Sequence, residues 1–356
     1  MAHGIEWWHW EESSESRLLA CLDDSNEVIK MVKTRAGCLE ATRKISLKEK
    51  EREITDDQVL VKVHKAYICG SELHYYRGHY PTYVSLPIFP GHEGGGTIVE
   101  VGSKVSDYSV GDKVIVYSDV LITPSGADPL FSDYARSPLR CLQRVPEGTD
   151  MDTACLAEPL SCAVDAIYSC GVELGDTAVV IGLGFMGQLI LQGIKKSGAD
   201  SVIAVDVVDS KLKLARQRGA DIAINTNEED PVKRVLDQTN GEGADIVIEA
   251  VGVGKTVNQA ASMLKKGGIL GLFGWVTRPA EIDLSQWHTK YLRPKILKIP
   301  NYKAKMPWAE KGFQLIKQGI LEVKSLITNE YPLAKLSEAF EKYDTDPDVI
   351  KIAIKP

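Results

Sequence analysis

Four side chains of types that bind metal ions stand in three short segments of the sequence. Cys69 opens a short polar run, His92 and Glu93 follow a glycine, and Glu158 precedes a proline. A thiolate, an imidazole and a carboxylate form a mixed set that can hold Zn²⁺ with one coordination position open, as catalytic zinc requires. A substrate oxygen in the open position is polarised and its pKa is lowered. We therefore predict a zinc site formed by Cys69, His92 and a carboxylate, for which Glu158 and Glu93 are both candidates.

Each of these residues taken alone has an ordinary structural explanation. A single cysteine is often a small buried hydrophobic residue, and a histidine beside a glycine is often structural. Glu158 also suits the acidic first turn of a helix. Their joint occurrence with the dinucleotide-binding pattern described below favours the metal site.

Two further polar residues follow Cys69 at short spacing. Ser71 and His74 lie two and five positions after it. A hydroxyl beside the bound alcohol can pass its proton through the cofactor ribose to an exposed imidazole, which makes these two residues candidates for a proton relay. The alternative is that His74 is a turn residue in a tyrosine-rich loop.

A glycine-rich turn predicts a dinucleotide site. The run Gly182-Leu183-Gly184-Phe185-Met186-Gly187 follows an apolar strand and opens a helical pattern at 188–196. The glycines permit a tight turn that brings backbone N–H groups to a pyrophosphate at the helix N-terminus. Asp206 stands 19 positions after Gly187, where a carboxylate binds the adenosine ribose hydroxyls and repels a 2′-phosphate. We therefore expect NAD.

Two alternatives at this site remain open. Asp206 could simply cap the turn that follows its strand. Lys211 and Arg216 lie close enough in sequence to accommodate NADP.

The elements that position these groups are of two kinds, and together they predict an α/β chain. From about residue 28 to 160, short alternating runs such as 59–63 and 112–116 are typical of an all-β unit. From 177 to about 275, continuous apolar strands alternate with helical patterns, which predicts a doubly wound parallel sheet of the Rossmann type. A helix at about 308–318 and a strand at 349–354 follow.

Composition excludes several functional classes. The 356 residues carry a net charge of −7 without a long basic run, so a nucleic-acid partner is not expected. No run approaches the roughly 18 to 20 apolar residues of a membrane helix. Seven loosely spaced cysteines do not form a disulfide framework, and the Trp-rich start lacks the features of a signal peptide. We therefore expect a cytoplasmic enzyme that acts on a small molecule, with no membrane partner.

The motifs together resemble the zinc-dependent medium-chain dehydrogenase/reductase superfamily, and within it sorbitol and other polyol dehydrogenases. The segments that carry the resemblance are 69–75, 91–93, 101–102, 111–114, 158–161 and 182–187. It implies that Cys69 and His92 bind zinc, while family members vary in whether the carboxylate matching Glu93, the one matching Glu158, or both complete the site. It also implies the Ser71–His74 relay and a homo-oligomer, either a dimer or a tetramer.

The resemblance further implies how the chain divides. A GroES-like catalytic domain is expected at residues 28–160 and 300–356, with a Rossmann NAD-binding domain at 161–299 inserted between its two parts. Residues 1–27 are expected to form an N-terminal extension of unassigned role.

The sequence departs from the family pattern at three places. Glu72 stands where the family usually has Asp, so contacts near the zinc differ. The stretch 117–136 contains no cysteine, although the family's structural-zinc lobe has four, so we expect one catalytic zinc and no structural zinc. The segment 280–301, with Trp287, His288 and Lys290, is unlike its usual counterpart.

A cluster of tyrosines and basic residues after Cys69 bears on the substrate. Its hydroxyl, guanidinium and ring contacts suit a polyol, a sugar or a cyclitol, although the same residues suit a solvated loop that uses tyrosine for packing: Tyr75, Tyr76, Arg77, His79, Tyr80 and Tyr83. The expected function is hydride transfer between NAD and a secondary alcohol. The alternatives are redox-neutral elimination or epimerisation through transient oxidation, and an NAD-binding protein that has lost catalysis.

Overall fold

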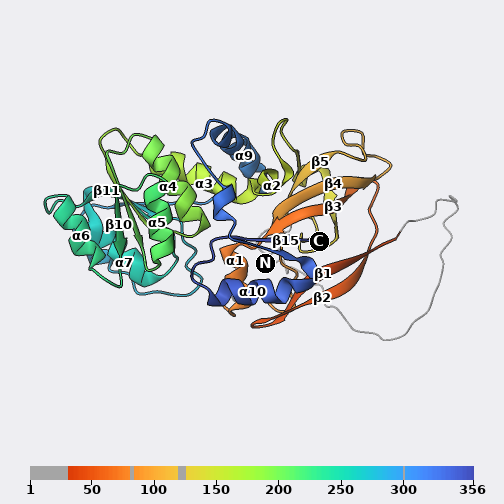
Figure 1. Cartoon of the computed structure of the whole chain (residues 1–356), viewed down its shortest axis with the longest axis horizontal. Coiled ribbons are helices and arrows are strands. Elements are labelled where there is room, and N and C mark those ends of the chain that lie inside the picture. The colour runs from red at the N-terminus through yellow and green to blue at the C-terminus, as the bar shows by residue number, and fades with distance from the viewer. Residues whose placement is uncertain (1–30, 81–83, 119–125, 300) are drawn as a thin grey trace, which may run out of the picture.

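The computed structural model describes residues 31–80, 84–118, 126–299 and 301–356, which form a mainly-β part and an α/β part lying side by side (Figure 1). The expected extension at 1–27 and Tyr83 lie outside the described residues. The predicted combination of a doubly wound parallel sheet with a mainly-β part is confirmed by the strand pairing.

The α/β part is built on a parallel sheet of six strands. Their order across the sheet is β10 (Ile222–Asn225), β9 (Ser201–Asp206), β8 (Thr177–Ile181), β11 (Ala244–Glu249), β12 (Leu264–Leu272) and β13 (Arg293–Ile296). The chain reverses direction across the sheet between β8 and β11, and ligands of doubly wound sheets bind at the carboxyl ends of the strands at such a point.

Both faces of this sheet are buried, which explains its continuous apolar strands. Val180 and Ile248 point into one core with helix α4 (Phe185–Lys196), and their neighbours Val179 and Val247 point into a second core with α6 (Pro231–Gln238) and α7 (Gly254–Met263). Adjacent residues of a strand face opposite sides, so the middle of a strand covered on both sides is a continuous apolar run. Two further helices belong to this part, α5 (Asp209–Gln217) and α8 (Leu284–Thr289).

The mainly-β part contains a hairpin and a seven-stranded sheet. The hairpin is β1 (Val32–Ala41) with β2 (Lys44–Arg52). The sheet contains β14 (Asn329–Pro332), β15 (Ile352–Lys355), β3 (Gln58–Tyr67), β4 (Glu93–Val101), β5 (Lys113–Tyr117) and β7 (Leu142–Arg144) in that order, with β6 (Tyr134–Pro138) also paired to β3. Short helical elements complete this part: α1 (Gly70–Tyr76), η1 (Leu139–Cys141), α2 (Met151–Ala154), η2 (Lys324–Leu326) and η3 (Leu333–Lys335).

The end of the chain returns to the mainly-β part. Strand β15 pairs antiparallel with β3, through Ala353 opposite Tyr67. The strand predicted at 349–354 is therefore present, but it begins at Ile352, and Val349 and Ile350 are buried in the preceding loop. Helix α3 (Ala157–Cys170) spans the expected domain boundary at residue 160, and α9 (Tyr302–Lys317) packs along it.

A buried carboxylate fixes α1 against the end of the chain. Asp344, in helix α10 (Leu336–Thr345), is almost fully buried and lies 2.5 Å from both Arg43 and Arg77. Arg77 directly follows α1, and Arg43 belongs to the β1–β2 turn. A carboxylate held by two guanidinium groups links three segments distant in sequence, which orients the helix that carries Ser71 and His74.

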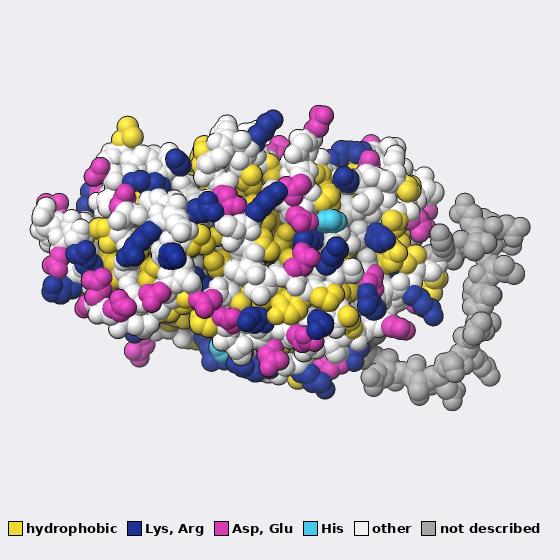
Figure 2. All heavy atoms as spheres, in the orientation of Figure 1, with side chains coloured by type: hydrophobic (Ala, Val, Ile, Leu, Met, Phe, Trp, Pro, Cys, Tyr) yellow, Lys and Arg dark blue, Asp and Glu magenta, His cyan; other side chains and the backbone are white. Residues whose placement is uncertain are grey.

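The surface agrees with the charge pattern of the sequence. Acidic and basic side chains are interspersed over the described part of the face in Figure 2, without an extended basic stripe. Among the described residues, the helices are too short or too polar to cross a bilayer.

Candidate metal and nucleotide site

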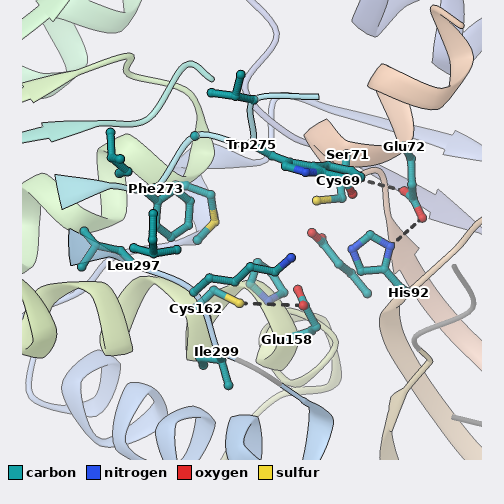
Figure 3. Close-up of a pocket in the computed structure, with 18 of the residues that line it drawn as sticks. Cys69, Ser71, Glu72, His92, Glu158, Cys162, Phe273, Trp275, Leu297 and Ile299 are labelled. Atoms are coloured by element: carbon teal, nitrogen blue, oxygen red, sulfur yellow. Dashed lines mark hydrogen bonds and ion pairs between the residues drawn. The ribbon is translucent and has the colours of Figure 1, made fainter. Parts of the chain in front are cut away.

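Strand pairing brings the first three predicted ligands together. Cys69 follows β3, and Glu93 begins β4, where it pairs with Tyr67 of β3. One ligand atom from each of Cys69, His92 and Glu93 lies within 4.8 Å of the others. The three side chains lie in a cavity of about 630 Å³. In Figure 3, Cys69 and His92 point into this cavity from the mainly-β part.

Glu72 orients two of these ligands. Its Oε1 accepts hydrogen bonds from the Gly91 N–H at 2.7 Å and from Nδ1 of His92 at 2.9 Å, and its Oε2 accepts one from the Cys69 N–H at 2.9 Å. With Nδ1 engaged, Nε2 of His92 is the nitrogen left to bind a metal. Glu72, the residue that departs from the family pattern, thus contacts both the Cys69 segment and the His92 segment.

The ligand cluster favours a positive charge. Burial disfavours the imidazolium form of His92, but the Glu72 carboxylate and the Cys69 sulfur outweigh burial and raise the pKa of His92 well above its usual value. A site that stabilises a proton between a carboxylate and a sulfur also stabilises a cation.

Glu93 is fully buried and held by a lysine from the end of the chain. Its Oε2 lies 2.5 Å from Nζ of Lys351, whereas its Oε1 is buried and accepts no hydrogen bond from the described residues. Burial raises the pKa of Glu93, and Lys351 opposes that rise. The Lys351 ammonium also lies 4.8 Å from the ring centroid of Phe185 in the glycine-rich turn. Lys351 therefore contacts both the ligand cluster and the cofactor turn.

Glu158 lines the same cavity but stands apart from the cluster of three. It is in the first turn of α3, and its Oε1 lies 2.5 Å from Nζ of Lys305 on α9 and 3.8 Å from Sγ of Cys162. Burial alone would raise the pKa of this carboxyl, but Lys305 and His92 hold it below its usual value. The structure therefore pairs Glu158 with a lysine and leaves Glu93 beside Cys69 and His92.

The two proposed relay residues lie on α1. Ser71 lines the cavity. His74 lies one turn further on, with its ring centroid 6.4 Å from that of Trp275 and 6.2 Å from that of His79. Burial, with the charges of Arg77 and His79, lowers the pKa of His74, so its imidazole is neutral and able to accept a proton.

The glycine-rich turn has the close contacts that its sequence predicts. Gly182 follows β8 with φ at +90°, and a Cβ on Gly187 would lie 1.8 Å from the carbonyl oxygen of Gly182. A side chain at Gly187 is therefore impossible without moving the turn away from α4. Gly184 is the N-cap of α4, and Met186 reaches the cavity that holds the ligand cluster.

Asp206 lies at the carboxyl end of β9, beside this turn. Its Oδ2 accepts the Leu183 N–H at 2.6 Å, and its Oδ1 accepts the N–H groups of Val207 and Val208. These contacts include those expected of a turn cap, and the one to Leu183 ties the carboxylate to the glycine-rich turn.

Much of the tyrosine-rich cluster contributes to packing. Tyr76 is buried with its ring 5.3 Å from that of Phe340, and Arg77 pairs with Asp344. Tyr75 is also buried, but it lines the cavity.

Three residues that contact the carboxylates of the site were not identified from the sequence. Lys305 and Lys351 come from the last sixth of the chain, and Cys162 lies one turn after Glu158. Neither lysine belongs to a local motif. The sequence signal for the two lysines is that Glu93 and Glu158, once buried, each need a cationic partner.

Comparison with known proteins agrees with this geometry. Residues 55–130 match the alcohol dehydrogenase GroES-like domain, and residues 186–308 match the zinc-binding dehydrogenase domain. A sorbitol dehydrogenase of Halalkalibacterium halodurans is 31% identical over 320 residues, which cover 84% of this chain and 92% of the relative.

Solved structures are similar over nearly the whole chain. A 2R,3R-butanediol dehydrogenase from Bacillus subtilis has a TM-score of 0.77 at 26% identity, covering 91% of this chain and 99% of its own. A putative zinc-binding dehydrogenase from Sinorhizobium meliloti bound to NADP has a TM-score of 0.80 at 25% identity, covering 91% of this chain and 100% of its own. The chain belongs to the zinc-dependent medium-chain dehydrogenase/reductase family and is an oxidoreductase of the alcohol dehydrogenase type.

The residues present fit the metal that the family implies. Sulfur, imidazole nitrogen and carboxylate oxygen are the donors that Zn²⁺ takes in catalytic sites. The orphaned Oε1 of Glu93 is a buried acceptor that a cation would satisfy.

Glu72→Gln tests whether Glu72 orients His92 for metal binding. Removing the negative charge behind His92 is expected to lower zinc affinity about tenfold to a hundredfold, since contacts of this kind tune metal ligands by that amount. Competition with a chromophoric chelator measures the affinity, and Glu51→Gln on exposed β2 is the control. Unchanged zinc affinity in a folded Glu72→Gln protein would show that Glu72 has no such role.

Proposed function

We propose that this enzyme transfers hydride between NAD(H) and a secondary alcohol or ketone, with a polyol, sugar or cyclitol as substrate. The observation that carries the proposal is that one cavity is lined by the Cys69–His92–Glu93 cluster, by Ser71 and by Met186 of the glycine-rich turn. A cation site and a nicotinamide site that open on the same space are what hydride transfer from a carbinol needs.

The residues around the cavity have separate roles in this proposal. Zinc, when bound, polarises the alcohol oxygen and lowers its pKa. Cys69, His92 and Glu93 would hold the ion, with His92 oriented by Glu72. Ser71 would accept the hydroxyl proton, and the imidazole of His74, whose pKa burial lowers, would be the final acceptor of that proton. The apolar walls exclude water from the reacting carbon.

Cys69→Ser and His92→Ala are expected to abolish alcohol oxidation and to leave NADH binding nearly intact, because the cofactor turn is built separately. A panel of sugars, polyols and cyclitols with NAD, followed at the NADH absorbance, measures turnover, and NADH fluorescence measures binding. Cys38→Ser, a buried thiol of β1, is the control. Metal analysis is expected to find one zinc per chain. Full activity of the zinc-stripped wild-type enzyme would contradict the proposal.

The preference for NAD over NADP depends on Asp206. A carboxylate at the end of β9 accepts the ribose hydroxyls and repels a 2′-phosphate. Asp206→Ser is expected to raise the KM for NAD about tenfold, as the loss of a hydrogen bond to a charged group implies, and to lower the KM for NADP. Initial rates with both cofactors measure the ratio of the KM for NAD to the KM for NADP. Asp237→Ser on exposed α6 is the control. A wild-type enzyme that prefers NADP would overturn this part of the proposal.

The redox-neutral alternative is not favoured, because the sorbitol dehydrogenase and the 2R,3R-butanediol dehydrogenase that resemble this chain are named as dehydrogenases. Net accumulation of NADH during turnover of a simple polyol separates the two activities, since elimination or epimerisation returns the hydride to the product.

We also propose a cytoplasmic homo-oligomer, with domain boundaries near residues 160 and 300 as expected from the sequence. Strand β13 pairs only with β12 among the described strands, and Ile296 on it is 71% exposed. An unpaired edge with an apolar side chain favours association with a second chain. Light scattering is expected to show a dimer or tetramer that Ile296→Lys weakens. A monomer at micromolar concentration would contradict the proposal.

A further inference from the structure

A second imidazole lies beside His74, and the chemistry described above does not use it. The ring centroid of His79 is 6.2 Å from that of His74, with an angle of 32° between the ring planes. Both side chains are partly exposed. His79 belongs to the tyrosine-rich cluster, whose other basic member, Arg77, is occupied by its pairing with Asp344. The role of His79 is therefore still to be assigned.

The end of helix α1 brings the two imidazoles together. Gly78 follows the helix with φ at +78°, and a Cβ there would lie 2.8 Å from Oγ1 of Thr42, so the turn needs glycine. The Gly78 N–H donates to the Tyr75 carbonyl at 2.9 Å, and the His79 N–H donates to the His74 carbonyl at 2.8 Å. These two hydrogen bonds form a Schellman motif, in which the residue after the glycine commonly contacts the one five positions before it.

His74 is only partly open to solvent. Its Nδ1 is buried and has no hydrogen-bond partner among the described residues. Its ring packs edge-on against Trp275, with the centroids 6.4 Å apart and the planes at 81°. The Trp275 ring is itself held by Tyr75, 5.8 Å away. A proton that reaches His74 therefore has a restricted route to water, and a neighbouring acceptor would widen that route.

The surroundings of His79 suit a group that accepts a proton and then releases it. Burial lowers the pKa of His79, and three guanidinium groups lower it further, in the order Arg278, Arg77 and Arg43. The last two are paired with Asp344, which offsets part of their charge, whereas Arg278 is exposed on the loop after β12. The imidazole is therefore neutral near neutral pH, and its protonated form gives up the proton readily.

The separation of the two rings suits transfer through one water. Two imidazoles that share a direct hydrogen bond have ring centres closer than the 6.2 Å found between His74 and His79. A polar contact across a somewhat longer gap is commonly bridged by a water molecule, which conducts a proton by accepting one and donating another.

We propose that His79 is the outer member of the proton relay, taking the proton from His74 and delivering it to solvent. This inference rests on the proposed alcohol dehydrogenase function and extends its proton path. For each alcohol oxidised, the hydride goes to NAD and one proton leaves the hydroxyl. That proton passes to His74, crosses to neutral His79 and is lost to a water or a buffer base, which returns both imidazoles to their neutral forms. Ketone reduction uses the same path inward.

Two variants test the outer position. His79→Gln keeps a polar side chain, and His79→Phe keeps a ring against His74, but neither carries a proton. Both are expected to slow proton release about tenfold at low buffer concentration, because proton transfer by a positioned side chain contributes about a hundredfold or more. A pH-indicator dye follows a single turnover of the zinc-loaded enzyme with NAD and the best substrate among sorbitol, xylitol, myo-inositol and 2,3-butanediol. His288→Gln, exposed on α8, is the control.

Two further measurements separate proton transfer from a structural effect. A high concentration of HEPES, a buffer base too bulky to reach the zinc site, is expected to restore fast release in both His79 variants. The double variant His74→Gln/His79→Gln is expected to release protons no more slowly than His74→Gln, because the two residues serve one path. NADH affinity and zinc content are expected to equal those of wild type in both His79 variants.

The possible failures are distinguishable. Wild-type release rates in both His79 variants at low buffer would overturn the inference and leave the dehydrogenase function standing. Slow release in His79→Gln that His79→Phe corrects, or that HEPES does not restore, would show a packing role and overturn the inference as well. Absence of NADH formation with all four alcohols and with the wider panel, in zinc-loaded wild-type enzyme, would overturn the proposed function and the relay with it.

Discussion

The buried carboxylate of Glu72 is the contact on which the arrangement of the site depends. Its two oxygens accept hydrogen bonds from the Cys69 N–H, the Gly91 N–H and the His92 ring. A buried charge is tolerated only where donors surround it. Because these donors come from segments that follow β3 and precede β4, satisfying Glu72 also aligns the sulfur and the imidazole that face the cavity.

Three buried acids in this region each have a different cationic partner or donor. Glu72 is held by His92 and backbone N–H groups, Glu93 by Lys351 and Glu158 by Lys305. The two lysines come from segments after the parallel sheet, where β15 and α9 return to pack beside β3 and α3. The return of the chain thus has an electrostatic function: it supplies the positive charges that oppose protonation of Glu93 and Glu158.

The parts of the site that follow from local chemistry could be predicted from the sequence. Local patterns of a few residues indicate the glycine turn at 182–187, the apolar strands and the ligand candidates Cys69, His92 and Glu93. Lys305 and Lys351 could not be predicted, because their importance arises only when distant elements pack together. The tyrosine-rich cluster left two alternatives open for a similar reason: Tyr76 and Arg77 have the chemistry of substrate contacts, but packing against Phe340 and pairing with Asp344 occupy them.

We expect one cation to be shared by Cys69, His92 and Glu93 beside the cofactor turn. X-ray absorption at the zinc edge of the zinc-loaded, full-length protein tests it most directly. The expected spectrum has a single sulfur neighbour at about 2.3 Å, with the remaining neighbours nitrogen or oxygen at about 2.0 to 2.2 Å. Two sulfur neighbours would place Cys162 on the metal, and a spectrum without sulfur would remove Cys69 from it; either result would contradict the account.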